Sequence, residues 1–282
     1  MGTLEHTMTP SAHALTNERD LFHRSWPNPA ARATVLIVHG MGEHSGRYDK
    51  FALHLVACGY RVHALDHAGH GNSPGQRGHV SRFSELTGGV CACTEHLAAD
   101  YPGQPLILLG HSLGGLIAAR HLLDHQDSYV AAVLSAPALR IAVPVPGWKK
   151  AMAQFLSRHW PTLALSNELD PKLLSHDHAE VEAYIADPLV HSRVSSRFYT
   201  ELLTTMDDVL ERAGEIRLPT LVISGGDDQI VDPAGAIQLH RDLGSERREV
   251  HVLEGLYHEV LNELDPERVH HLVSDWIDRE LA

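Results

Sequence analysis

Residues 106–119 read Leu-Ile-Leu-Leu-Gly-His-Ser-Leu-Gly-Gly-Leu-Ile-Ala-Ala, and this stretch decides the fold. An apolar run that enters Gly-His-Ser-Leu-Gly and continues into a second apolar run with small residues predicts a strand, a sharp turn and a helix. In such a G-x-S-x-G turn the serine is strained, and Gly110 and Gly114 let strand and helix approach closely. We therefore expect the Ser112 hydroxyl to project from the C-terminal edge of a sheet as a nucleophile.

The same turn predicts a hydrogen-bond donor for negative charge that develops during a reaction. The backbone N–H of Leu113 lies at the start of the expected helix, and a helix N-terminus favours an oxyanion. A plain turn with a capping serine is the alternative. That alternative would not explain three glycines at 110, 114 and 115.

A second glycine-rich turn predicts the partner donor. Residues 34–38 read Thr-Val-Leu-Ile-Val and are followed by His39-Gly40-Met41-Gly42. A strand that stops at His-Gly-x-Gly is a common place for half of an oxyanion hole, because glycine lets backbone N–H groups turn toward the site. We expect the Met41 N–H to act with that of Leu113, and a simple glycine-rich turn is the alternative.

Short apolar strands alternate with helical segments in both halves of the chain. This alternation predicts an α/β fold, in which helices cover both faces of a mostly parallel central sheet. We expect residues 1–139 and 206–282 to form the core and residues 140–205 to form a helical insertion. The expected strands are 34–38, 60–65, 106–109, 130–134, 220–224 and 249–253, and the expected helices are 51–59, 84–101, 113–124, 148–160, 179–186 and 267–280.

The insertion is rich in large apolar side chains, and its sequence predicts no strand between residues 145 and 196. One face of its first helix carries Trp148, Met152, Phe155, Leu156 and Trp160, and the other carries Lys149, Lys150, Gln154 and Arg158. Such an insertion predicts a lid over the active site. The apolar face would contact a lipid surface transiently, line an acyl-chain cavity through Trp148, Phe155 and Leu156, or pack on the core.

Charge and cysteine content argue against several classes of function. The 282 residues include 23 Lys and Arg and 36 Asp and Glu, and the net charge of −13 argues against nucleic-acid binding. Three cysteines predict reduced thiols in a cytoplasmic protein. Residues 1–16 lack the apolar segment of a signal peptide, and no run approaches the ~18 apolar residues of a membrane span. No motif predicts a metal or a cofactor, since metal-binding and nucleotide fingerprints are missing.

Two residues late in the chain complete a serine-based mechanism. A serine hydroxyl needs a histidine base, and a carboxylate must orient that histidine. In the α/β-hydrolase arrangement the acid and then the histidine follow the serine, each after a strand. Asp228 and His258 fit this order. Asp227 competes with Asp228, which we prefer because an apolar pair follows it and can anchor its loop. His39, His70 and His111 precede the serine and are expected to shape the pocket.

Four motifs together resemble those of the monoacylglycerol lipase family of α/β-hydrolases. They are HGMGEHSGRY at 39–48, DHAGHGNS at 66–73, GHSLGG at 110–115 and EGLYH at 254–258. The resemblance runs from about residue 34 to 276. It implies hydrolysis of monoacylglycerols to fatty acid and glycerol through an ester on Ser112, without a cofactor. It also implies a triad of Ser112, Asp228 and His258, with the N–H groups of Met41 and Leu113 as oxyanion donors.

The resemblance further implies a polar site for the glycerol head group, formed by Glu43, Arg47, His111 and Tyr184. A buried site that binds free hydroxyls would discriminate against a triacylglycerol. This chain has Leu113 where many members have Met, and Leu261 where some have a polar residue. A lysophospholipase, a general carboxylesterase and a catalytically inactive lipid-binding module are the alternative functions.

Overall fold

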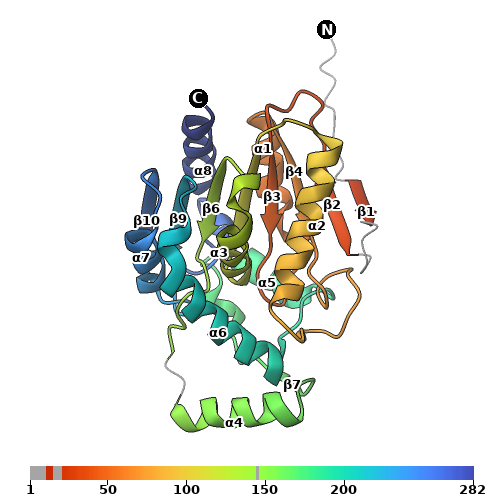
Figure 1. Ribbon diagram of the computed structural model, residues 1–282, viewed down its shortest axis with the longest axis vertical. Helices are drawn as coiled ribbons and strands as arrows, with labels where there is room; N and C mark the ends of the chain where they lie inside the picture. The colour runs from red at the N-terminus through yellow and green to blue at the C-terminus, as the bar shows by residue number, and fades with distance from the viewer. Residues whose placement is uncertain (1–10, 15–20, 144–145) are drawn as a thin grey trace.

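An eight-stranded sheet forms the centre of the protein, in the order β1-β2-β4-β3-β5-β6-β9-β10 (Figure 1). The computed structural model describes residues 11–14, 21–143 and 146–282. The first two strand pairings are antiparallel, and the remaining ones are parallel. The strands are β1 (Ser11–Ala14), β2 (Phe22–Trp26), β3 (Ala33–Val38), β4 (Tyr60–Leu65), β5 (Leu106–His111), β6 (Ala131–Ser135), β9 (Thr220–Gly225) and β10 (Arg248–Leu253).

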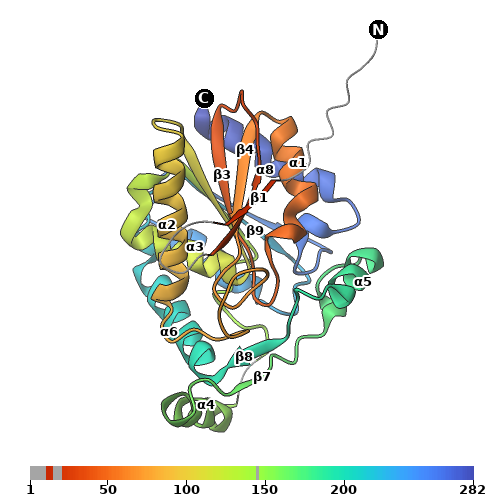
Figure 2. The same cartoon turned by 90° about the vertical axis from the view of Figure 1, so that its right-hand side faces the viewer.

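Helices cover both faces of the sheet, as Figures 1 and 2 show. Successive residues of a strand point to opposite faces, so Leu36 and Val38 join one apolar cluster while Val35 and Ile37 join the other. This double burial explains why the parallel strands are apolar at nearly every position. The first cluster includes side chains from α2 (Ser84–Asp100), α3 (Leu113–His125), α6 (Ser196–Arg212) and α7 (Pro233–Asp242), and the second includes side chains from α1 (Asp49–Ala57) and α8 (Pro266–Leu281).

The N-terminal edge of the sheet is formed by residues that precede the first expected strand, 34–38. Strands β1 and β2 were not predicted, and β2 pairs antiparallel with β4. The β2 sequence is Phe-His-Arg-Ser-Trp, in which His23 and Ser25 are buried polar residues. A strand with so few apolar residues lacks the pattern that predicts one. The expectation about a signal peptide in residues 1–16 falls mostly on residues outside the described part.

The insertion lies beyond the C-terminal ends of the parallel strands, at the end of the molecule opposite to α8 (Figure 2). It contains α4 (Gly147–His159) and α5 (His178–Ala186). The expectation of no strand here was wrong, because β7 (Ala164–Ser166) and β8 (Arg193–Ser195) form an antiparallel pair. Three-residue strands are too short to produce a periodic signal. Helix α6 crosses the boundary placed at residue 205, so that division of the chain stays a proposal.

Short 3-10 helices complete the described elements. They are η1 (Ser45–Tyr48), η2 (Gln126–Ser128), η3 (Pro171–Leu173), η4 (Ala213–Glu215) and η5 (Val260–Asn262). None of the helices within the described ranges combines the length and the apolar character that crossing a bilayer requires.

The backbones pack very closely at the turn between β5 and α3. Ser112 has φ 53° and ψ −118°, a strained conformation for a residue with a side chain. A Cβ on Gly114 would lie 1.9 Å from the carbonyl oxygen of Val38, and one on Gly110 would lie 2.3 Å from that of Gly114. A Cβ on Gly115 would lie 2.8 Å from the Cα of Pro137. The backbones are therefore packed so closely that the three positions require glycine.

We predict opposite effects of alanine at two helical glycines. Gly114→Ala forces α3 away from β3 and should lower the free energy of unfolding by about 3 kcal/mol or more. Gly88→Ala should leave it unchanged or raise it by up to ~1 kcal/mol, because Gly88 lies in α2 with open space around its Cα and alanine favours a helix. Guanidinium-induced unfolding of both variants measures the difference. Equal stability of the two variants would contradict the packing described for the turn.

Candidate active site

Ser112 lies at the edge of a cavity of about 960 Å³ beneath the insertion. The serine is held by its backbone, because its N–H donates to the carbonyl of Ser135 at 2.9 Å and its carbonyl accepts from Ala138 N–H at 2.9 Å. The same cavity is lined by Met41, Leu113 and His258. The structure therefore brings Ser112, His258 and both expected oxyanion positions to one site.

His258 and Asp228 form a buried hydrogen-bonded pair. The Nδ1 of His258 lies 2.7 Å from Oδ2 of Asp228, and the side chains are 4% and 0% exposed. An ionised carboxylate only accepts hydrogen bonds, so His258 carries its proton on Nδ1 and has its basic Nε2 available. Asp227 is exposed and is not the partner of His258. Among the described residues no hydrogen bond joins the Ser112 hydroxyl to His258, and such bonds often tighten only when substrate binds.

The environment of Asp228 keeps its carboxyl group ionised. Burial on its own would raise the pKa of this group, but the hydrogen bond and the charge interaction with His258 outweigh it. The backbone N–H groups of Ile230 and Val231 donate to Oδ1 at 2.8 and 3.0 Å and lower the pKa further. The net result is a pKa below the usual value for aspartate, which preserves the acceptor that His258 needs.

The two expected oxyanion donors have unpaired N–H groups. Within the described part of the chain, neither Met41 N–H nor Leu113 N–H donates to a protein acceptor. Gly40 approaches the serine so closely that a Cβ there would lie 3.3 Å from the Cβ of Ser112. The loop after β3 therefore lies directly against Ser112 and carries an unpaired N–H donor at Met41.

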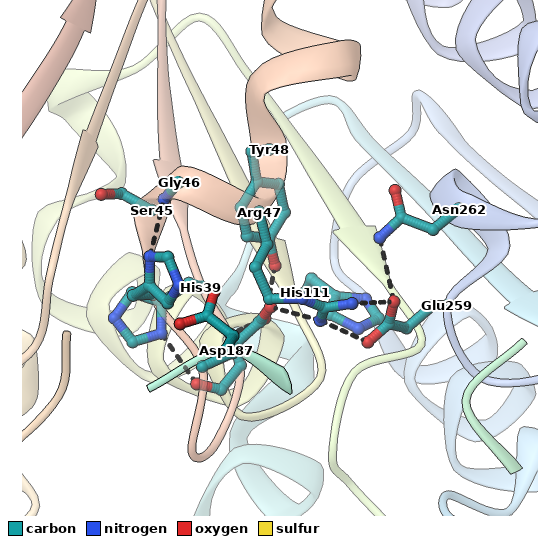
Figure 3. A network of polar contacts seen from close by, with 12 residues as sticks. His39, Ser45, Gly46, Arg47, Tyr48, His111, Asp187, Glu259 and Asn262 are labelled. Atoms are coloured by element: carbon teal, nitrogen blue, oxygen red, sulfur yellow. Dashed lines mark hydrogen bonds and ion pairs between the residues drawn. The ribbon is translucent and has the colours of Figure 1, made fainter. Parts of the chain in front are cut away.

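A buried ion cluster connects the loop after β3 to the loop that carries His258 (Figure 3). Arg47 donates from Nη1 to Glu43 at 2.9 Å, and from Nη1 and Nη2 to the two carboxylate oxygens of Glu259 at 2.5 and 2.8 Å. The side chains of Arg47 and Glu259 are only 9% and 5% exposed. Asn262 and Tyr48 donate to Glu259 and Glu43 at 2.9 and 2.7 Å. Every charge in the cluster thus has charged or polar partners, as burial requires.

The protonation states in this cluster follow from its geometry. Burial alone would lower the pKa of Arg47, but Glu259 and then Glu43 raise it well above the ordinary value. Burial alone would raise the pKa of Glu259, and the Arg47 charge lowers it instead. Two carboxylates share one guanidinium, so this wall of the cavity carries net negative charge.

All four residues expected at the head-group site line the cavity, namely Glu43, Arg47, His111 and Tyr184. Their availability differs. The groups of Glu43 and Arg47 are largely occupied by each other and by Glu259. His111 places Nδ1 3.2 Å from Ser135 Oγ, which leaves Nε2 for a substrate, and the ring of Tyr184 packs 4.8 Å from the Arg47 guanidinium. Leu261 is buried and does not line the cavity.

His111 is neutral in this site. Burial lowers its pKa to about 4, and repulsion from His258, whose ring centroid lies 5.0 Å away, acts in the same direction. A neutral imidazole can donate or accept a hydrogen bond, which suits an alcohol partner. The residue that sequence reasoning missed is Glu259. Its position next to His258 was the available signal, but its partner Arg47 is 212 positions away in the chain.

Most of the apolar wall of the cavity comes from the insertion and α6. Trp148, Met152 and Leu156 of α4 line it, together with Leu202 and Met206 of α6. Phe155 was expected there as well, and this was wrong. Phe155 is absent from the lining and is 52% exposed, because a helix directs adjacent residues about 100° apart. Among the described residues, no group of three or more His, Cys, Asp or Glu side chains is arranged to hold a metal ion.

Comparison with known proteins identifies the family. The family model described as "Serine aminopeptidase, S33" matches residues 29–265. A monoacylglycerol lipase of Mycolicibacterium smegmatis is 36% identical over 89% of this chain and 90% of its own length. This chain belongs to the monoacylglycerol lipase family of α/β-hydrolases.

Two further relatives agree with this assignment. Human monoglyceride lipase is 34% identical over 93% of this chain and 88% of its own length. The crystal structure of Paleococcus ferrophilus monoacylglycerol lipase, with 36% identity, superposes with a TM-score of 0.85 over 92% of this chain and 99% of that one. Membership in the monoacylglycerol lipase family makes the chain a carboxylic ester hydrolase with the α/β-hydrolase fold.

We predict that removing the cation from the buried cluster of Arg47, Glu43 and Glu259 strongly destabilises the protein. Arg47→Met leaves two carboxylates buried without their cation and should lower the free energy of unfolding at pH 7 by about 3–5 kcal/mol. Arg241→Met removes an exposed partner of Asp242 and should leave the free energy of unfolding nearly unchanged, because solvent screens this pair. Guanidinium-induced unfolding at pH 7.5 and pH 4.5 provides the measurement.

The pH dependence has a defined sign. The lowered pKa of Glu259 stabilises the native state above the pKa of the unfolded chain, and this contribution is lost as pH falls. In Arg47→Met the buried carboxylates lack a cation, so their protonation in acid removes the cost of burying unpaired charge. The difference in free energy of unfolding between the wild type and Arg47→Met should therefore be smaller at pH 4.5 than at pH 7.5. A difference that stays constant or grows would contradict the ion pairing described for the cluster.

Proposed function

We propose that this enzyme hydrolyses monoacylglycerols to a fatty acid and glycerol. One observation carries the proposal: Ser112 and His258 lie in a cavity with polar groups from the core loops and an apolar wall from α4 and α6. A monoacylglycerol has the same division, with two free hydroxyls on one side of the ester and an alkyl chain on the other. The relatives named above are monoacylglycerol or monoglyceride lipases, which supports the same substrate.

The mechanism we propose is acyl transfer through Ser112. The serine oxygen attacks the ester carbonyl while Nε2 of His258 takes its proton, and Asp228 stabilises the imidazolium. The N–H groups of Met41 and Leu113 bind the oxyanion of the tetrahedral intermediate. Its collapse breaks the bond to glycerol, which leaves with the proton from His258. Water then repeats these steps on the acyl ester, releasing the fatty acid and restoring Ser112.

The head-group site is proposed to select a neutral alcohol. His111 Nε2 and the Tyr184 hydroxyl are the groups available to the glycerol hydroxyls, and Arg47 and Glu259 form the charged background. The excess of carboxylates disfavours a phosphate in the leaving group. A lysophospholipid is therefore the weaker candidate, and a triacylglycerol would leave these polar groups unpaired.

The insertion is proposed to act as a lid that contacts a lipid surface transiently. Trp148, Met152, Phe155 and Trp160 are each at least half exposed, and Lys149 and Lys150 lie beside them. Exposed aromatic side chains next to lysines suit the interface between lipid head groups and acyl chains. The division into a core of residues 1–139 and 206–282 and a lid of 140–205 belongs to this proposal.

The unpaired thiols of Cys58, Cys91 and Cys93 support a proposed cytoplasmic location.

A kinetic comparison of five substrates tests the proposed function. We expect 1-monooleoylglycerol to give a higher kcat/KM than lysophosphatidylcholine, oleoyl lysophosphatidic acid or triolein, with p-nitrophenyl butyrate as an indicator of the intact nucleophile. Ser112→Ala should reduce turnover of every substrate by at least ~10³-fold without unfolding the protein. Asp228→Asn should show a loss of similar order, whereas Asp227→Asn should retain activity.

The outcomes of this comparison separate the alternatives. Activity on the butyrate alone would reduce the assignment to a general esterase, and preference for lysophosphatidylcholine would replace the substrate class. Turnover that survives Ser112→Ala would overturn the nucleophile. Binding of monooleoylglycerol without turnover would indicate an inactive lipid-binding module.

Substitutions at two adjacent residues of α4 should differ in their effect on the preference for long acyl chains. Leu156→Ser introduces a hydroxyl into the apolar wall and should lower kcat/KM for monooleoylglycerol several-fold more than for monobutyrylglycerol. Phe155→Ser is the matched control. It should leave the ratio of kcat/KM for monooleoylglycerol to kcat/KM for monobutyrylglycerol unchanged when both substrates are below their critical micelle concentration. Phe155→Ser should also weaken binding of the enzyme to lipid vesicles, because Phe155 is on the exposed side of α4. Equal loss on both chain lengths in Leu156→Ser would count against the acyl wall.

A further inference from the structure

A buried histidine is hydrogen bonded to the carbonyl group of the peptide unit that carries the Met41 N–H. His39 is 0% exposed, and its Nδ1 lies 2.8 Å from the carbonyl oxygen of Gly40. That carbonyl and the N–H of Met41 belong to the same planar peptide. In a trans peptide the two groups point in opposite directions. The bond from His39 therefore determines where the Met41 N–H points.

A second loop fixes the ring of His39. The backbone N–H of His67 donates to Nε2 of His39 at 3.0 Å, and the His67 ring lies 3.2 Å from the His39 carbonyl through its own Nε2. The ring centroids are 4.2 Å apart. Because Nε2 of His39 accepts a hydrogen bond, its proton must be on Nδ1, where it is donated to Gly40. Only one neutral tautomer satisfies both contacts.

The surroundings keep His39 in this neutral form. Burial lowers its pKa well below the ordinary value, and the neighbouring His70 acts in the same direction. On the other side of the loop, the N–H of Gly40 donates to Glu43 at 2.6 Å. The loop is thus fixed by side chains at both of the peptide units that flank Gly40. A hydrogen bond accepted by the Gly40 carbonyl also polarises the peptide and strengthens its N–H as a donor.

We propose that His39 is a positioning residue for the oxyanion hole, which acts by donating from Nδ1 to the Gly40 carbonyl. The motif at residues 66–73 is then its support, because His67 selects the tautomer through its backbone N–H. This inference rests on the proposed role of the Met41 N–H. It does not depend on which ester is the natural substrate.

Two substitutions at His39 separate its two hydrogen bonds. The amide nitrogen of asparagine replaces Nδ1, so His39→Asn keeps a donor for Gly40 and loses the contact with His67. The amide oxygen of glutamine replaces Nε2, so His39→Gln keeps the acceptor for His67 and loses the donor. With p-nitrophenyl butyrate, kcat should fall ~10²–10³-fold in His39→Gln and less than about tenfold in His39→Asn, at nearly constant KM.

A transition-state analogue provides a readout that a purely structural role would not alter. An alkyl trifluoromethyl ketone forms an oxyanion on Ser112, and its Ki should rise in His39→Gln by the same factor by which kcat/KM falls. Melting temperatures of the two variants should be similar. Equal losses in both variants, or an unchanged Ki in His39→Gln, would overturn the proposal.

The wild-type enzyme gives an independent measurement if a variant fails to fold. In ¹⁵N-histidine spectra, the His39 resonances should show a proton on Nδ1 from pH 8 to pH 5. A proton on Nε2, or an imidazolium in that range, would overturn the inference. Failure of the proposed function is distinguishable, because it would appear as turnover by Ser112→Ala or as a different preferred lipid, with the His39 tautomer unchanged.

Discussion

The close contact between helix α3 and strand β3 is the constraint on which the site depends. Gly114 lies so near the Val38 carbonyl that no side chain fits between them, and this contact holds the strained backbone of Ser112 in place. The strain at one residue is balanced by apolar packing of whole strands and helices around it. In the proposed mechanism Ser112 is consequently held in place before substrate arrives, which is a condition for efficient electrostatic stabilisation of a transition state.

A second level of organisation is electrostatic and joins residues that are distant in sequence. Arg47 binds carboxylates from the loop after β3 and the loop after β10, so one guanidinium links the loop that carries Met41 to the loop that carries His258. Buried ion clusters contribute little net stability, because desolvation offsets much of the attraction. The contribution here is mainly geometric, since the segment that runs from β3 to η1 and the segment that runs from β10 to η5 acquire a fixed relative position.

Much of the fold could be predicted from the sequence, because buried parallel strands are apolar on both faces and stand out from their surroundings. The turn at Ser112 was predictable for a similar reason, since its glycines are required by a local backbone geometry. Strand β2 could not be predicted, because its polar residues His23 and Ser25 are buried in a context that only the tertiary structure supplies. The partnership of Arg47 with Glu259 was also hidden, since charges reveal no partner until the chain is folded.

The C-terminal part of the proposed lid is hydrogen bonded to the loop that carries Met41. His191 N–H donates to the Gly42 carbonyl at 2.8 Å, one residue from Met41, and a Cβ on Gly42 would lie 2.2 Å from the His191 carbonyl oxygen. Ser195 N–H donates to the Gly78 carbonyl at 2.8 Å. The segment that covers the cavity therefore also supports the loop that carries Met41, so the cover of the proposed active site and its proposed oxyanion donor belong to one hydrogen-bonded unit.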